Sequence, residues 1–160
     1  MVFRGGVLPE VGNQIAALPM RWDARDTVRV LMVTSRDSGR WVMPKGWTMD
    51  GEKPWDAAAI EALEEAGARG HIGSEELGQY RYGKVMPDGR VVPCVVRVYP
   101  LFVEALLRNW KERGERKRKW FSPKAASKRV AEPELAALLL SIHDRPQKQP
   151  VIRELLKRYR

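Results

Sequence analysis

The segment Pro54-Trp-Asp-Ala-Ala-Ala-Ile-Glu-Ala-Leu-Glu-Glu-Ala-Gly67 follows a glycine-bearing loop, Gly46-Trp-Thr-Met-Asp-Gly-Glu52. It predicts a helix, because proline suits a first turn, where its missing N–H would be unpaired anyway. The alanines, Leu and Glu that follow favour a helix, and a glycine is a typical stop. On a 3.6-residue period, an apolar stripe is expected to be buried. Its members are Trp55, Ala59, Ala62, Leu63 and Ala66.

Three glutamates on this helix, Glu61, Glu64 and Glu65, are spaced at i, i+3 and i+4, so their carboxylates should converge on one face. Like charges at this spacing repel, and no Lys or Arg stands between Lys53 and Arg69 to offset them. One interpretation is a solvated acidic face. The other is a metal site, because a glycine loop before the helix lets a backbone carbonyl approach the carboxylates. Clustered oxygen ligands suit Mg²⁺ or Mn²⁺, and we favour this second interpretation.

The pattern Gly46, five residues, Glu52, seven residues, then Ile60-Glu-Ala-Leu-Glu-Glu-Ala-Gly-Ala68 resembles the Nudix box of Nudix hydrolases. The resemblance implies that Gly46, Glu61, Glu64 and Glu65 ligate the cation, that Glu64 or Glu61 is the general base, and that Glu52 supports the loop. One position departs from the box. Ile60 stands where the family has an arginine that helps to orient the acidic residues.

Bulk properties indicate one soluble domain. A chain of 160 residues with 44% hydrophobic and 31% charged residues fits a single folded unit. A formal net charge of +9 predicts a polyanionic partner. The single cysteine, Cys94, cannot form an intramolecular disulfide, and no signal peptide or membrane-spanning run is evident. A cytoplasmic location without membrane contact is therefore expected.

Strands are expected on both sides of the central helix, with further helices at the end of the chain. Strands are predicted at 14–20 (ended by Pro19), 27–34, 41–43, 68–72, 77–85, 91–103 and 119–121, and helices after Ser122 and at 135–142 and 151–159. This order predicts an α/β fold, an α/β/α sandwich with a mixed sheet, as the Nudix resemblance also implies. We assign 1–143 to this domain and 144–160 to a linker and a basic tail helix, packed on the domain or appended to it.

Sequence outside the box resembles diphosphoinositol polyphosphate and diadenosine polyphosphate phosphohydrolases. The similar segments are Thr34–Gly46, Asn109-Trp110 and Arg116–Phe121, within a pattern covering 14–142. The resemblance implies a small, phosphate-crowded substrate held by basic side chains, a chemistry that suits arginine forks and lysine charges. The candidates are Arg21, Arg36, Arg40, Lys45, Arg116, Lys117 and Arg118. The alternative for the 108–119 run is a solvated basic loop.

Two other functions remain as alternatives: removal of 5′ pyrophosphate from RNA, and a non-catalytic module that binds nucleotides or RNA. The basic charge and Ile60 favour the module. The acidic triplet counts against it, because carboxylates repel phosphates unless a cation is present. The sequence leaves open the exact substrate, the preferred metal and the oligomeric state.

Overall fold

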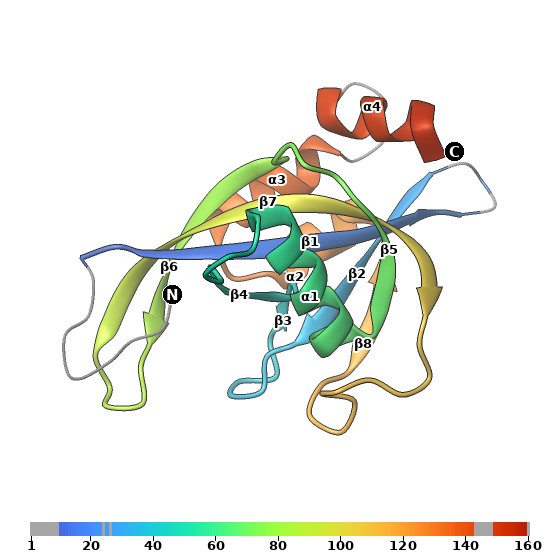
Figure 1. Cartoon of the computed structure of the whole chain (residues 1–160). Coiled ribbons are helices and arrows are strands. Elements are labelled where there is room, and N and C mark those ends of the chain that lie inside the picture. Colours follow the sequence, from blue (N-terminus) through green and yellow to red (C-terminus); the bar gives the residue numbers. More distant parts are fainter. Residues whose placement is uncertain (1–9, 24, 26, 143–148, 160) are drawn as a thin grey trace.

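The computed structural model describes residues 10–23, 25, 27–142 and 149–159. Figure 1 shows a sheet with helices on both faces. The strands are β1 (Gly12–Trp22), β2 (Val28–Thr34), β3 (Trp41–Val42), β4 (Lys45–Trp47), β5 (Ala68–Ile72), β6 (Gly78–Val85), β7 (Val91–Leu106) and β8 (Arg118–Phe121). The helices are α1 (Pro54–Ala66), α2 (Pro123–Arg129), α3 (Pro133–Ser141) and α4 (Pro150–Tyr159).

The sheet is mixed, as predicted. Its main path runs β3-β2-β1-β7-β5, with β4 on β1, β6 on β7 and β8 on β2. The central pair β1 and β7 is parallel, whereas the other pairs are antiparallel. Parallel β1 and β7 are joined by a long crossover that contains α1, the connection such a pair requires.

Strand β1 continues through Pro19 to Trp22, so the prediction that Pro19 ends it was wrong. Along one edge, β1 pairs first with β4 and then, from Met20, with β2. The N–H of Ala17 points to this edge and donates to the Pro44 carbonyl at 3.1 Å. Because backbone direction repeats every two residues, Pro19 faces the same edge, before the β2 ladder begins, where its missing N–H removes no ladder bond.

Two cores lie on the two faces of the sheet, and β1 shows why. Ile15 and Ala17 pack with α1, whereas Ala16 and Leu18 pack with the buried residues of α2, α3 and α4. Alternate side chains of a strand point to opposite faces, and both faces of this strand are covered. In Figure 1, α1 lies in front of the sheet, with α2 and α3 behind it. The predicted α/β/α sandwich is confirmed.

Several local predictions are confirmed at single residues. Helix α1 begins with Pro54 in its first turn, and Gly67 ends it in the left-handed conformation, with a φ of 61°. The Ser122 hydroxyl caps α2 by accepting a hydrogen bond from the Ala125 N–H at 3.1 Å. Gly89, with a φ of 86°, sits in the β6–β7 hairpin turn. Pro93 pairs only with β6, so it lies at an edge, as expected.

The buried stripe of α1 was predicted partly wrong. Ala62 and Ala66 are buried, but Leu63 is 40% exposed, and Ala57 and Ala58 are buried instead. Small alanines let the helix approach the sheet closely. A register that buried Leu63 would hold the helix farther from the sheet, so the helix turns this larger residue outward.

The tail helix α4 packs on the domain through buried Ile152 and Leu155. The Gln149 side chain accepts hydrogen bonds from the N–H groups of Val151 and Ile152, and donates one to the Leu77 carbonyl. This side chain therefore caps α4 and ties its start to the domain. The predicted boundary between 143 and 144 lies outside the described residues and stays a prediction. Among the helices described, none combines the length and apolar character that a bilayer span requires.

Candidate active site

A cleft of about 280 Å³ lies beside α1, between the loop that carries β4 and the segment 107–117 that leads into β8. Its wall contains four carboxylates and four cations. These are Asp37, Glu61, Glu65 and Glu112, and Arg36, Lys45, Lys84 and Arg116. Acidic groups from α1 and from two loops therefore meet basic groups from four segments, a distribution that the linear sequence does not show.

Glu61 and Glu65 form the acidic centre of this cleft. They stand one helical turn apart, and their carboxyl groups share a hydrogen bond. Burial raises the pKa of Glu65 to about 9, and the hydrogen bond with Glu61 adds to the effect. Burial also raises the pKa of Glu61. In the absence of a cation, the pair therefore holds a proton at neutral pH.

Gly46 is the backbone neighbour of this pair. A Cβ atom at this position would overlap the Glu61 carboxyl group, so only glycine lets the carboxyl lie against the loop. Strand β4 fixes the approach, because Gly46 pairs with Ile15 of the central strand β1. The structure thus brings together the predicted glycine and two of the three predicted metal-ligating glutamates.

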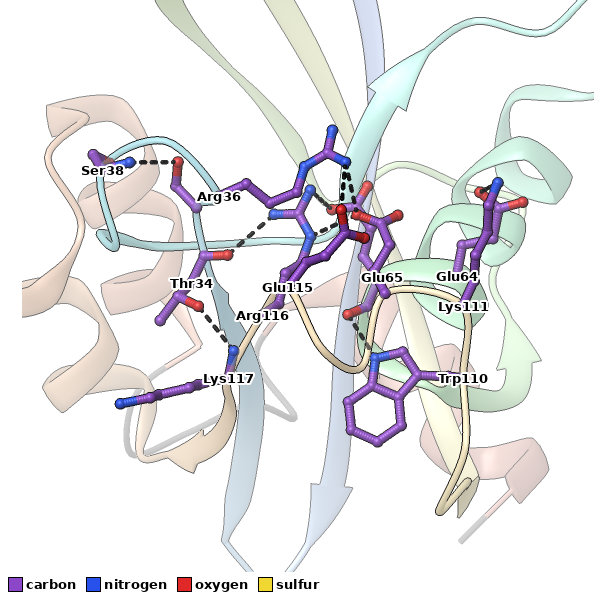
Figure 2. A network of polar contacts seen from close by, with 12 residues as sticks. Thr34, Arg36, Ser38, Glu64, Glu65, Trp110, Lys111, Glu115, Arg116 and Lys117 are labelled. Carbon is purple, nitrogen blue, oxygen red and sulfur yellow. Dashed lines mark hydrogen bonds and ion pairs between the residues drawn. The ribbon is translucent and has the colours of Figure 1, made fainter.

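Arg116 is a largely enclosed cation of the cleft, with a side chain 11% exposed. Its Nε donates to Glu112 at 2.9 Å, its Nη1 donates to the Thr34 carbonyl at 3.1 Å, and its Nη2 lies 3.5 Å from Glu65. Figure 2 shows this side chain between the Thr34 backbone and Glu65. Arg116 was predicted to bind substrate, and that role stays a prediction. Here its three side-chain nitrogens contact Glu112, the Thr34 carbonyl and Glu65.

Two other predicted phosphate-binding residues line the cleft. Arg36 reaches over it and pairs with Glu115 at 3.4 Å and with Glu112 at 3.7 Å, while remaining 55% exposed. Lys45 lies deeper, 5.2 Å from the centroid of the Tyr82 ring. Burial lowers the pKa of Lys45, and the charge on Glu65 opposes this shift. Both ammonium and guanidinium groups can therefore meet an anion that enters here.

Glu64 does not line the cleft, although it was predicted to join Glu61 and Glu65 on one face. Its carboxylate lies 3.6 Å from the Nζ of Lys111, and Figure 2 shows this pair apart from the Arg116 contacts. The distant Lys111 supplies the counter-charge that the helix itself lacks. Glu52 is exposed in the loop before α1, where its N–H donates to the Met49 carbonyl. The roles assigned to Glu64 and Glu52 stay predictions.

The remaining predicted substrate residues lie outside the cleft lining. Arg21 stacks on Trp120, with 4.2 Å from its Cζ to the ring centroid. Arg40 pairs with Glu132 at 3.4 Å. The last two positions are Lys117, whose N–H donates to the Thr34 hydroxyl, and Arg118, which donates to the Ala66 carbonyl at 2.9 Å. Their contribution to substrate binding also stays a prediction.

The donor chemistry of the cleft fits a hard divalent cation. Among the residues described, no three Asp, Glu, His or Cys side chains form a ready-made metal cage. Mg²⁺ does not need one, because it is usually bound through one or two carboxylates together with substrate phosphates and water. The Glu61–Glu65 pair beside Gly46 supplies such a partial set, and the groups lining the cleft could hold the phosphates.

Several cleft residues were not found from the sequence, among them Glu112, Lys84, Tyr82 and Gln14. Glu112 is buried beside Arg116, and the buried Gln14 accepts a hydrogen bond from the Tyr82 hydroxyl at 2.5 Å. Only Gln14 carried a signal, since it is a polar residue in a strand that is otherwise apolar. The others belong to a polar segment and to an exposed hairpin, where their residue types are ordinary.

The chain matches known proteins over most of its length. The profile of the NUDIX domain family covers residues 13–140. Nudix hydrolase 16, mitochondrial, of Arabidopsis thaliana is 35% identical over 98 residues, which are 59% of this chain and 54% of that protein. The chain spans about half the length of this protein and of two other Arabidopsis Nudix hydrolases. The human diphosphoinositol polyphosphate phosphohydrolase 3-alpha is 36% identical over 118 residues, 72% of this chain and 67% of that protein.

Solved structures share the fold. A binary complex of the C. elegans Ap4A hydrolase aligns with a TM-score of 0.60 and 21% identity, over 81% of this chain and 93% of that one. The MutT protein of Methanosarcina mazei aligns with a TM-score of 0.62 and 19% identity, over 86% and 96% of the two chains. These likenesses confirm the predicted arrangement of sheet and helices.

Proposed function

Because the chain belongs to the NUDIX domain family, we propose that it is a hydrolase that uses Mg²⁺ or Mn²⁺ to cleave a phosphoanhydride bond. The substrate class is a small, phosphate-rich molecule, such as a diphosphoinositol polyphosphate or a dinucleoside polyphosphate. The names of two similar proteins support this class: the human phosphohydrolase acts on diphosphoinositol polyphosphates, and the C. elegans enzyme on Ap4A. One observation carries the proposal: the partly buried Glu61 and the buried Glu65 stand beside a glycine in a cleft lined by basic side chains.

Glu61 and Glu65 would hold the cation, together with the Gly46 carbonyl and the substrate. When bound, the cation neutralises charge on the pyrophosphate and lowers the pKa of a coordinated water. Because ligating carboxylates must be ionised, binding would release the proton that Glu61 and Glu65 share. Arg116 stays beside the ionised pair and keeps it from moving apart.

The general base is one of two glutamates. Glu61 lies in the cleft and can accept a proton there, whereas Glu64 would first have to leave Lys111. This arrangement favours Glu61, in which case Glu65 and the Gly46 carbonyl would hold the cation. The phosphates that do not react would contact Arg36 from one side and Lys45 and Lys84 from the other. Such remote contacts contribute binding energy to the transition state.

The test is phosphate release from a panel of phosphoanhydrides, measured with Mg²⁺, with Mn²⁺ and with EDTA. The panel contains a diphosphoinositol polyphosphate, dinucleoside polyphosphates and a 5′-triphosphorylated oligonucleotide. The expected result is release that needs a divalent cation and that Glu61→Gln abolishes. The matched control is Glu75→Gln, an exposed position away from the cleft lining. No turnover of any substrate would refute the proposal in favour of a binding module, and turnover of the oligonucleotide alone would favour RNA 5′ pyrophosphate removal.

A further inference from the structure

A second hollow, of about 620 Å³, lies where the 107–117 segment passes the end of α1. It is lined by Arg108, Asn109, Trp110, Arg113 and Arg118. Its lining has no carboxylate, in contrast to the acidic cleft. Its volume is within the range of about 300 to 1,000 Å³ that is usual for ligand pockets.

Trp110 and Arg118 form the rigid side of this pocket. The Trp110 ring N–H donates to the Glu65 carbonyl at 3.2 Å, and the Arg118 guanidinium stacks on the same ring at 3.9 Å from its centroid. Arg118 also donates to the Ala66 carbonyl, which places its charge at the C-terminus of α1. Helix α1 has no basic residue in its own last turn, so Arg118 stabilises this end from strand β8.

Arg108 and Arg113 bring two more positive charges to the same pocket. Arg113 donates to the Asn109 side chain at 2.6 Å. Within the described part of the chain, no carboxylate pairs with Arg108, Arg113 or Arg118. Burial and the nearby Arg113 lower the pKa of Arg118. Arg113 and Arg118 therefore repel each other, and an oxyanion bound in the pocket that they line with Arg108 would offset that repulsion.

A third hollow connects this pocket with the candidate active site. It measures about 410 Å³, shares Arg36 and Arg116 with the cleft, and shares Arg113 with the second pocket. Lys117 also lines it. Arg36, Arg116, Lys117 and Arg113 thus form a basic band from the acidic cleft towards Trp110, and Glu115 is the one carboxylate among the described residues that line this third hollow. An extended chain of phosphates could follow this band.

We propose that the pocket of Arg108, Trp110, Arg113 and Arg118 binds a backbone phosphate of a single-stranded nucleic acid that runs along this band. Guanidinium groups beside an aromatic ring are the usual means of holding such strands without reading their sequence. This proposal does not rest on the proposed function, because occupation of the pocket depends only on the arginines and not on hydrolysis in the acidic cleft.

The test is fluorescence anisotropy with labelled single-stranded RNA and DNA of about ten nucleotides, a length typical of such sites. The variant is Arg108→Ala with Arg113→Ala, because neither side chain supports α1. The control is Lys124→Ala with Lys128→Ala, which removes the same charge from exposed positions on α2, across the sheet from α1. The arginine variant should weaken binding about tenfold or more, as expected for lost charge-assisted contacts. Its slope of log affinity against log salt should fall by about 0.7, which corresponds to one phosphate contact on a single strand.

An equal loss of affinity in both double variants would refute the proposal that the pocket binds phosphate, because net charge alone would then explain binding. Absence of binding by the wild-type protein would also overturn it. Hydrolysis of the phosphoanhydride panel is measured on the same preparations. Hydrolysis without oligonucleotide binding refutes the pocket and leaves the proposed function standing. Binding that depends on the arginines, without hydrolysis, refutes the proposed function and supports the pocket.

Discussion

Replacement of Arg116 by methionine tests whether this residue holds the acidic cleft together. The change keeps an unbranched side chain but removes the contacts with Glu112, Glu65 and the Thr34 carbonyl. The side chains of Arg116, Glu65 and Glu112 are only 11%, 5% and 12% exposed. Loss of one partner from a buried ion pair typically costs about 3 to 5 kcal/mol, because the other charge stays buried without compensation.

For a chain of this size, about 1 kcal/mol corresponds to about 2 to 4 °C in Tm. Arg116→Met should therefore lower Tm by about 6 to 20 °C at neutral pH without a cation. The loss should shrink in acid, because protonated carboxyl groups no longer need the guanidinium. The Tm of Arg116→Lys should lie between those of the wild-type protein and Arg116→Met, since lysine keeps the charge but cannot make all three contacts of the guanidinium.

Thermal unfolding in EDTA, followed by circular dichroism, measures this effect. Lys157→Met is the matched control, because Lys157 pairs with Glu154 on the surface, where both side chains are more than 60% exposed. That control should change stability by less than about 0.5 kcal/mol. If the Tm values of Arg116→Met and Lys157→Met agree within a degree or two, Arg116 does not hold the carboxyl groups in place. That result would favour the predicted role of Arg116 in substrate binding.

Three further predictions concern the acidic pair. Glu65→Gln should lower kcat on the best substrate about 100-fold or more, because it weakens cation binding at the reacting phosphate, and an unchanged kcat would remove Glu65 from the site. In EDTA, the free energy of unfolding should fall as pH rises from about 4.5 towards 9, because the raised pKa of Glu65 means that the folded state binds the proton that the unfolded state has lost. Glu65 can contribute at most about 1.4 kcal/mol per pH unit to the slope of unfolding free energy against pH. Chemical denaturation should show a flatter slope for Glu65→Gln. Gly46→Ala should displace the Glu61 carboxyl and weaken Mn²⁺ binding, measured by calorimetry, while Gly114→Ala, where a Cβ meets no other atom, should leave metal affinity unchanged.

The sequence alone determined the elements whose signals are local. Pro54 and Gly67 bound α1, Ser122 caps α2, and Gly89 makes the hairpin turn. These signals act through contacts within a few residues, so a short stretch of sequence around each residue contains the whole signal. The spacing of the Nudix box likewise identified Gly46 and the carboxylates, because its fixed positions all lie within one continuous stretch of the chain.

Tertiary structure alone decided how the charges are paired. The spacing of the three α1 glutamates did not distinguish them. In the structure, Glu64 pairs with Lys111 and Glu65 pairs with Arg116, and both partners belong to the distant 107–117 segment. The exposure of Leu63 was also decided by packing, because the sheet accepts the alanine face of α1 more closely. Similarly, Arg116 and Arg118 stand two positions apart in the sequence yet serve different pockets. In a regular strand, side chains two positions apart would point to the same face, but Arg116 lies before β8 begins at Arg118. The elements packed around the two residues therefore determine which surface each one reaches.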